Sequence, residues 1–179
     1  MAERSDPIEL FAAWWNEERV AAVVATAAPD GRPSARAVVL EAFDEHGFVF
    51  FTSSQSPKAR DLAANPRAAL VFLWDARQVR VEGTVERVSD EENERQWERA
   101  ERKRALAAFE QSMPIKSRAE LERLYARVPE NPPRPSFWVG YRVVPEAVEL
   151  WELDPQDDVN DRFRFERGEA GWACTRLQP

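Results

Sequence analysis

The sequence predicts a mainly β protein, a small antiparallel barrel with helical insertions. Five apolar or alternating segments, joined by short turns, lie between Val20 and Val88. A highly charged helical stretch follows, and strand-like segments return from Phe137 onwards. This order of β, α and β predicts one domain over residues 1–179, in which residues 1–89 form the barrel half with an N-terminal helix. Residues 90–128 are then a helical insertion, and residues 129–179 are C-terminal strands that complete the site and the dimer.

Helix-start signals open the chain. Asp6 is placed to cap the helix, Pro7 suits its first position, and Glu9 can close a capping box. Apolar residues then recur at helical spacing, so we expect this helix to cover one end of the barrel. The expected apolar face comprises Ile8, Phe11, Ala12 and Trp15.

Turn residues divide the barrel half into strands. Asp30-Gly31 supplies the positive φ of a hairpin turn, and residues 44–47 form a second turn. Ser56-Pro57 begins a short helix over residues 58–64 by the same cap-and-proline pattern. The strands are expected at residues 20–26, 34–42, 48–52, 68–74 and 78–88.

The second half reads as helices followed by strands. Asp90 caps a long charged helix to about Phe109, and another helix is expected over residues 117–127. Prolines mark residues 129–135 as a loop. Further strands are expected at residues 137–144, 147–153, 162–167 and 171–177.

Composition limits the function classes. The net charge of −7 argues against a general nucleic-acid binder, because phosphate contacts need clustered Lys and Arg. A single cysteine, Cys174, and a single histidine, His46, exclude an intrachain disulfide and the common metal sites. With neither a signal-peptide pattern nor a long apolar run, we expect a cytoplasmic protein without a membrane partner.

The stretch from Arg36 to Lys58 concentrates phosphate-binding groups. It reads as strand, turn, strand, loop and helix start, with a cation at each end. Hydroxyl groups lie beside the second cation, at Thr52, Ser53, Ser54 and Ser56. Solvated surface charge is the simpler reading of the two cations, and Ser56 also suits a helix cap. Cations and hydroxyl donors on one rigid hairpin nevertheless favour a phosphate site.

Several motifs, in order along nearly the whole chain, resemble the FMN-binding split-barrel proteins and specifically the pyridoxamine 5′-phosphate oxidase family. They are RAVVL at 36–40, FFTSSQSPK at 50–58, RQVRVEG at 77–83, QS at 111–112, PSFWVGYRVVPEAVELW at 135–151, DRFRF at 161–165 and the terminal RLQP. The resemblance implies a homodimer with two FMN sites at the subunit interface. It also implies an oxidase whose reduced FMN is reoxidised by oxygen, releasing hydrogen peroxide.

The resemblance implies an intact FMN site. Arg36, Lys58 and Thr52 match phosphate-binding positions, and the backbone of Val39 and Leu40 matches the strand that faces the flavin. The remaining matched positions are Phe51, Gln78, the pair Gln111 and Ser112 that reaches across the dimer, and the pair Trp151 and Arg162 that closes over the cofactor. The family's basic residue before the lysine is Pro57 here, which removes one charge-assisted contact worth about 1–2 kcal/mol.

The substrate positions depart from the family. Glu41 stands where the family has a lysine, and Ala100 falls at the arginine position of the substrate-phosphate site. Asp158 and Asn160 replace the arginine and histidine that face the substrate. Because carboxylates repel a phosphate dianion, we expect a substrate other than pyridoxamine 5′-phosphate, neutral, cationic or an amine. Glu41 or Asp158 is the candidate anchor or proton acceptor.

Other readings stay open on the sequence alone. A genuine pyridoxine/pyridoxamine 5′-phosphate oxidase could use Arg99, Arg102 or Arg164 for the substrate phosphate. The phenazine-biosynthesis branch of the fold shares the Leu-Gln-Pro tail and offers a precedent for a changed substrate. A deazaflavin F420 reductase, a non-catalytic flavin carrier and a haem-binding split barrel are further alternatives, the last disfavoured by the single histidine.

Overall fold

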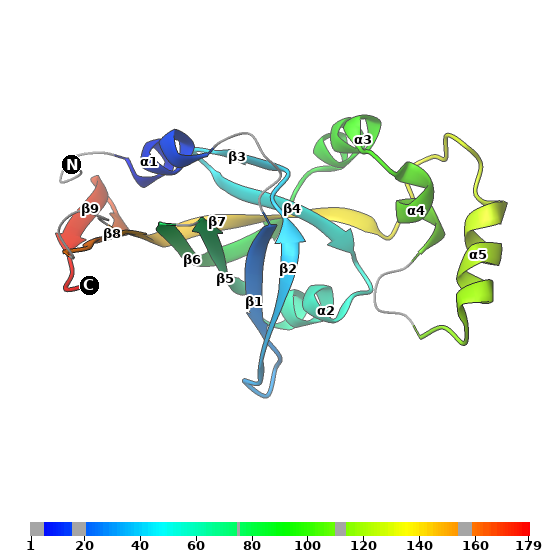
Figure 1. Ribbon diagram of the computed structural model, residues 1–179, viewed down its shortest axis with the longest axis horizontal. Helices are drawn as coiled ribbons and strands as arrows, with labels where there is room; N and C mark the ends of the chain where they lie inside the picture. Colours follow the sequence, from blue (N-terminus) through cyan, green and yellow to red (C-terminus); the bar gives the residue numbers. More distant parts are fainter. Residues whose placement is uncertain (1–5, 16–20, 75, 110–113, 154–158) are drawn as a thin grey trace.

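One curled antiparallel sheet dominates the structure, which is a computed structural model that describes residues 6–15, 21–74, 76–109, 114–153 and 159–179 (Figure 1). In these residues the strands pair in the order β2-β1-β5-β6-β7-β4-β3, and β8 and β9 continue outward from β7. The predicted mainly β class is therefore confirmed. The strands are β1 (Ala21–Ala27), β2 (Pro33–Val39), β3 (Ala42–Asp44), β4 (Gly47–Ser53), β5 (Arg67–Trp74), β6 (Arg77–Arg87), β7 (Trp138–Glu152), β8 (Asp161–Gly168) and β9 (Gly171–Arg176).

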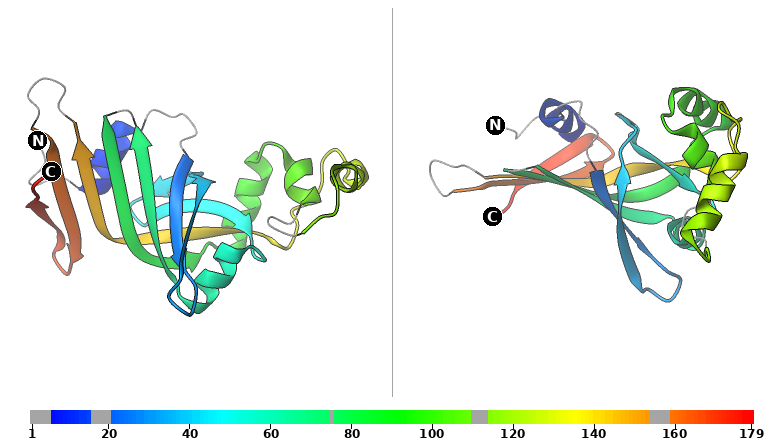
Figure 2. Two further views of the ribbon diagram at one scale, coloured as in Figure 1. Left: turned by 60° about the horizontal axis from the view of Figure 1, so that its bottom comes forward. Right: turned by 45° about the vertical axis from the view of Figure 1, so that its right-hand side comes forward.

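Helices lie at the two ends of the sheet and below it (Figures 1 and 2). They are α1 (Pro7–Trp14), α2 (Pro57–Ala64), α3 (Asp90–Arg99), α4 (Lys103–Ala108) and α5 (Arg118–Arg127). The strands β8 and β9 lie at one end of the molecule, and α3, α4 and α5 lie at the other (Figure 1). Among the described residues, no helix combines the length and apolar character needed to cross a membrane.

The N-terminal helix closes the core as the capping signals predict. Asp6 Oδ1 accepts from the Ile8 N–H at 2.7 Å, and the fully buried Phe11 makes edge-on contacts with the rings of Phe48 and Phe72. The expected apolar face is wrong at Ala12, which is exposed, because Pro7 occupies the buried side together with Ile8 and Phe11.

The longest strand replaces two predicted ones. The strands predicted at residues 137–144 and 147–153 are the single strand β7 (Trp138–Glu152), since a bulge opposite Glu82 and Gly83 absorbs the irregularity around Pro145 without ending the strand. One end of β7 pairs with β4 and the other with β8. This strand therefore connects the two ends of the molecule.

Two other predicted elements are divided. The strand expected at 34–42 is two strands, β2 and β3, and Leu40 and Glu41 lie between them. The helix expected over 90–109 ends at Arg99, because Ala100 is extended and Arg102 is left-handed with φ 56°. Its N-cap is Ser89 rather than Asp90. No glycine or proline lies at this break, so the sequence offered only its charge pattern, which predicts a continuous helix.

Candidate functional site

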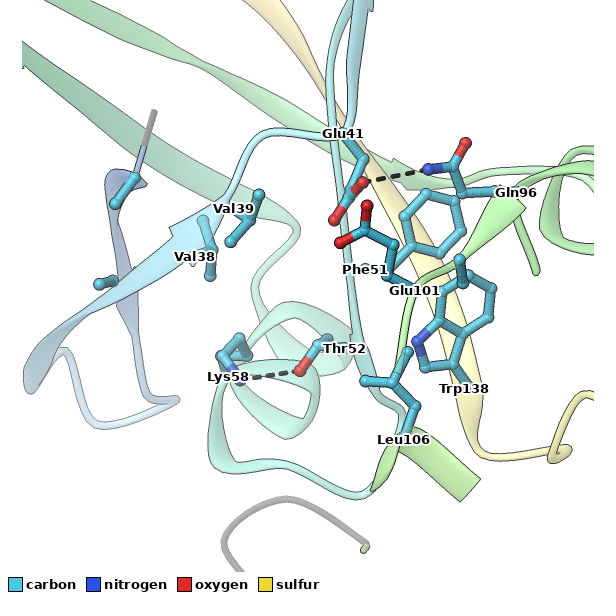
Figure 3. A pocket seen from close by; sticks show the side chains of 13 residues that line it. Val38, Val39, Glu41, Phe51, Thr52, Lys58, Gln96, Glu101, Leu106 and Trp138 are labelled. Carbon is cyan, nitrogen blue, oxygen red and sulfur yellow. Dashed lines mark hydrogen bonds between the residues drawn. The ribbon is translucent and has the colours of Figure 1, made fainter. Parts of the chain in front are cut away.

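A cavity of about 290 Å³ opens between β2, β4, α2 and the segment that joins α3 to α4 (Figure 3). Its lining combines small apolar residues, one aromatic wall, one cation and two carboxylates. The lining residues are Ala21, Ala37, Val38, Val39, Glu41, Phe51, Thr52, Lys58, Gln96, Ala100, Glu101, Leu106 and Trp138.

Thr52 and Lys58 form the cationic end of the cavity. The strand β4 ends at Ser53, and Ser56 then caps α2, its Oγ accepting from the Ala59 N–H at 3.4 Å. Pro57 takes the first position of this helix. The tight connection brings the Lys58 Nζ back to Thr52, where it donates to Oγ1 at 2.8 Å (Figure 3).

The ammonium group of Lys58 is desolvated. Its residue is only 7% exposed, and burial lowers its pKa below the usual value, with the nearby Arg36 guanidinium adding to the effect. The ammonium donates to a hydroxyl rather than to a carboxylate. A buried cation in this state is stabilised by an incoming anion, which restores the electrostatic partner lost with water.

Arg36 lies beside the cationic end but not in the cavity wall. Its Nη1 donates to Thr26 Oγ1 at 2.8 Å, and Thr26 donates to Asp61 Oδ2 at 2.6 Å. Its Nη2 donates to Ser34 Oγ at 2.8 Å and lies 3.9 Å from Asp61. The sequence pointed to Arg36 and Lys58 but not to Thr26 or Asp61, which carry no motif signal of their own.

A flat aromatic wall lines one side of the cavity (Figure 3). The rings of Phe51 and Trp138 stack with centroids 4.4 Å apart, and Trp97 packs edge-on against Trp138 at 5.1 Å. Gly140 makes room for this arrangement, because a Cβ there would lie 2.7 Å from Phe51 Cε1. The wall is therefore held by packing and presents an apolar surface to a ligand.

Glu41, Gln96 and Glu101 form the acidic end of the cavity. The carboxylates of Glu41 and Glu101 lie close together, across the cavity from Lys58 (Figure 3). The Nε2 of Gln96 donates to Glu41 Oε2 at 3.1 Å. Sequence reasoning found Glu41 and Ala100 but missed Glu101, because the unpredicted end of α3 is what turns Glu101 into the cavity.

Gln78, Trp151 and Arg162 form a cross-strand row away from the cavity. Gln78 pairs with Trp151, and Trp151 pairs with Arg162, so the three lie side by side on β6, β7 and β8. None of them lines the cavity of the same chain. The sequence predicted that these three residues share one FMN site with Lys58 and Thr52. Within a single chain, however, they lie apart from Lys58 and Thr52.

The remaining predicted residues fall in different places. Val39 lines the cavity, but the side chain of Leu40 is buried in the core. Asn160 precedes β8, and its Oδ1 is buried without a hydrogen-bond partner. Gln111, Ser112 and Asp158 lie outside the described residues.

The arginines considered as alternative ligands of a substrate phosphate do not line this cavity. Arg99 and Arg164 are absent from its lining, and Arg102 lines a different cavity between α4 and α5. Arg164 donates to Glu82 and Glu166, both at 3.1 Å, and these bonds raise its pKa. Within the described residues, no three His, Cys, Asp or Glu side chains gather as a metal site would require.

Comparison of the sequence with known families gives two matches. Residues 9–130 match the profile described as pyridoxamine 5′-phosphate oxidase. Residues 138–179 match the profile described as the pyridoxine 5′-phosphate oxidase C-terminal dimerisation region, which indicates a homodimer. Together the two matches span the cationic end and the cross-strand row.

Curated relatives carry the same family name. The chain is 46% identical to the pyridoxine/pyridoxamine 5′-phosphate oxidase of Rubrobacter xylanophilus, over 97% of this chain and 87% of the relative. It is 44% identical to the protein of that name from Burkholderia vietnamiensis, over 97% of this chain and 89% of the relative.

Solved structures agree with the fold. PhzG from Burkholderia lata 383, crystallised in complex with tetrahydrophenazine-1-carboxylic acid, superposes with a TM-score of 0.89 at 30% identity, over 98% of this chain and 93% of PhzG. A pyridoxamine 5′-phosphate oxidase-related, FMN-binding protein from Nostoc punctiforme shares the fold with a TM-score of 0.74 at 20% identity, over 89% and 88% of the two chains. The split-barrel prediction is thus confirmed, and the chain belongs to the pyridoxamine 5′-phosphate oxidase family.

Proposed function

We propose that the protein is an FMN-dependent oxidase that acts on a small molecule other than pyridoxamine 5′-phosphate and passes electrons to oxygen, forming hydrogen peroxide. One observation carries this proposal. The cavity has a buried cation and a hydroxyl at one end and two carboxylates at the other. The first end suits the phosphate of a flavin nucleotide, and the second disfavours a second phosphate.

The residues of the cationic end fit the cofactor. Lys58 and Thr52 would hold the FMN phosphate, with Arg36 adding positive charge from the neighbouring strand. The Phe51–Trp138 wall offers an apolar surface next to them. FMN, when bound, would supply the redox chemistry by accepting a hydride from the substrate and transferring electrons to oxygen.

A second copy of the chain would complete the site. The outer face of the sheet exposes Val23, Val39 and Leu73, which are 44%, 38% and 68% exposed. Such an apolar face suits a partner surface, and the dimerisation region includes the strands that carry Trp151 and Arg162. We therefore propose that the cross-strand row of one subunit faces the cavity of the other, with Gln111 and Ser112 also reaching across.

The acidic end would select the substrate. Glu41 and Glu101 would repel a phosphate dianion, and they would attract an amine or another cationic group. A substrate bound there would lie against the aromatic wall beside the flavin. Glu41, oriented by Gln96, is positioned to anchor an amino group or to accept a proton from it. Asp158 stays a second candidate for this role.

A genuine pyridoxine/pyridoxamine 5′-phosphate oxidase is the second candidate function. It is favoured by the names of relatives that are 46% and 44% identical over nearly the whole chain. The cavity opposes it, because the described lining holds one cation, Lys58, and the proposed FMN phosphate would already occupy that cation.

Two measurements test these proposals. The absorbance spectrum of the purified protein, or of protein incubated with FMN, should show bound flavin; a colourless protein that takes up no FMN contradicts the cofactor assignment. Pyridoxal 5′-phosphate formation from pyridoxamine 5′-phosphate should be slow or absent in the flavin-loaded protein. Turnover at the rate of an authentic family oxidase, assayed in parallel, would establish the second candidate instead. Hydrogen peroxide formation with amine substrates distinguishes an oxidase from a flavin carrier.

A further inference from the structure

A buried carboxylate lies on the outer face of the sheet. Glu149 lies near the C-terminal end of β7 and is only 4% exposed, although its neighbours in sequence, Val148 and Leu150, point into the apolar core on the opposite face. No motif position gives Glu149 a role, because glutamate in an alternating strand normally reaches solvent. A carboxylate taken out of water needs charged partners.

Arginines from both neighbouring strands supply these partners. Arg162 on β8 places Nε 3.2 Å and Nη2 3.0 Å from Glu149 Oε1. Arg80 on β6 places Nη1 3.5 Å from the same oxygen and is itself paired with Glu82. Glu82 also accepts from Arg164, so charges alternate along the outer face from Arg162 to Arg164.

The geometry fixes one guanidinium in particular. Two nitrogens of Arg162 contact one carboxylate oxygen, which restrains both the position and the plane of the group. The Arg162 side chain is still 32% exposed, so it remains accessible to a ligand. Arg162 belongs to the cross-strand row, next to Trp151.

We propose that Glu149 is a positioning residue, which holds Arg162 in the orientation needed to contact a flavin nucleotide bound by the dimer. This inference rests on the proposed function, in which Arg162 closes over FMN. Without the Glu149 charge, Arg162 would lose its restraint and sample several rotamers. The affinity for flavin would then fall, because binding would also have to order the Arg162 side chain.

FMN binding to the cofactor-free full-length dimer tests the inference, measured by quenching of FMN fluorescence. Glu149→Gln keeps the size of the side chain and removes its charge. It should weaken FMN binding about tenfold, comparable with the loss of one hydrogen bond to a charged group. Glu152→Gln is the matched control, since Glu152 lies on the same strand and pairs with Arg77 at 2.7 Å. It should change FMN affinity by less than about twofold, as expected for a partly exposed ion pair.

A double variant separates positioning from general stability. Arg162→Gln alone should weaken FMN binding at least as much as Glu149→Gln. The Glu149→Gln/Arg162→Gln variant should bind FMN no more weakly than Arg162→Gln, because Glu149 acts through Arg162. The inference would be overturned if the double variant lost affinity by the product of the two single-variant losses. It would also be overturned if Glu149→Gln bound FMN with wild-type affinity.

Folding and cofactor binding are controlled separately. If Glu149→Gln does not fold, Glu149→Asp keeps the charge and shortens the reach, and an intermediate loss of affinity is expected; wild-type affinity in that variant overturns the inference. Failure of the wild-type protein to bind FMN refutes the proposed function. Wild-type binding with unaffected variants refutes only the role of Glu149.

Discussion

The two ends of the cavity are built in different ways. At the cationic end, Lys58 is buried and Thr52 is 1% exposed, and a capped helix fixes their contact. At the acidic end, Glu101 is exposed and comes from the irregular segment between two helices. Packing and capping hold the first end in place, whereas the second end can change residues at small cost to the fold. Under the proposed function, the end that would hold the cofactor is the part of the cavity that the fold fixes, and the end that would select the substrate is the part that can vary.

The largest expected effect is the loss of the buried cation. Lys58→Met should weaken FMN binding by about 100-fold, corresponding to about 2.7 kcal/mol, because a desolvated charge-assisted contact to phosphate is lost. Isothermal titration with FMN measures this change. Lys116→Met is the control, since Lys116 is exposed and does not line the cavity. Equal affinities for both variants would contradict a phosphate site at this end.

The next effect restores a cation at the opposite end. Glu41→Lys, combined with Glu101→Gln, should lower the KM for pyridoxamine 5′-phosphate by about tenfold or more, since two repulsive charges are removed and one attractive charge is added. The affinity for FMN should stay within about threefold of wild type, as expected for residues on the far side of the cavity. Steady-state kinetics with the flavin-loaded protein measure the KM, and titration of the cofactor-free protein with FMN measures the affinity. An unchanged KM would show that the acidic end does not select against phosphate.

The lowered pKa of Lys58 predicts a pH dependence specific to the cationic end. The folded lysine releases its proton at a lower pH than the unfolded value of 10.5, so its attraction for FMN phosphate fades as pH rises through the lowered pKa. Affinity should therefore decline on the alkaline side before pH 10.5, whereas Lys58→Arg should keep it across this range. Fluorescence titrations over a pH series test the difference.

The same shift has the opposite sign for stability. Between the lowered pKa and 10.5 the unfolded chain binds more protons than the cofactor-free folded chain. The Lys58 contribution to the free energy of unfolding should therefore rise with pH in that window. Denaturant unfolding of the wild type against Lys58→Met isolates this contribution. A difference between the two proteins that falls with pH would contradict the burial of the ammonium.

The smallest expected effect concerns the hydroxyl. Thr52→Val preserves the shape of the side chain but removes the acceptor for Lys58 and the donor for a phosphate oxygen. FMN affinity should fall about fivefold, as for one hydrogen bond of about 1 kcal/mol. Ser54→Ala, at a less buried hydroxyl of the same loop, should have a smaller effect. A larger loss for Ser54→Ala would assign the phosphate contact to a different part of the loop.

Sequence reasoning succeeded where local chemistry determines structure. The caps at Asp6 and Ser56, and the turn at Gly31 with φ +82°, follow from properties of single residues. It failed where tertiary pairing decides, as in the merging of two predicted strands into β7. The division into residues 1–89, 90–128 and 129–179 stays a prediction.

Part of the candidate site could be predicted from the sequence for the same reason. Motif positions gave Thr52, Lys58 and Glu41, whose place depends on the local hairpin and helix start. Glu101, Asp61 and Glu149 were missed, because their roles depend on a helix break or on contacts between distant segments. The assigned roles of Gln111, Ser112 and Asp158 stay predictions.

The length of β7 has a consequence for mixed dimers. Its 15 residues carry Trp138 at one end and Trp151 near the other, about 40–45 Å apart along an extended strand. In a homodimer with shared sites, the two ends of each β7 would belong to two different active sites. Two inactive variants, one substituted at Lys58 and one at Arg162, should then complement each other. In the mixed dimer, one site carries both substitutions and the other site carries neither.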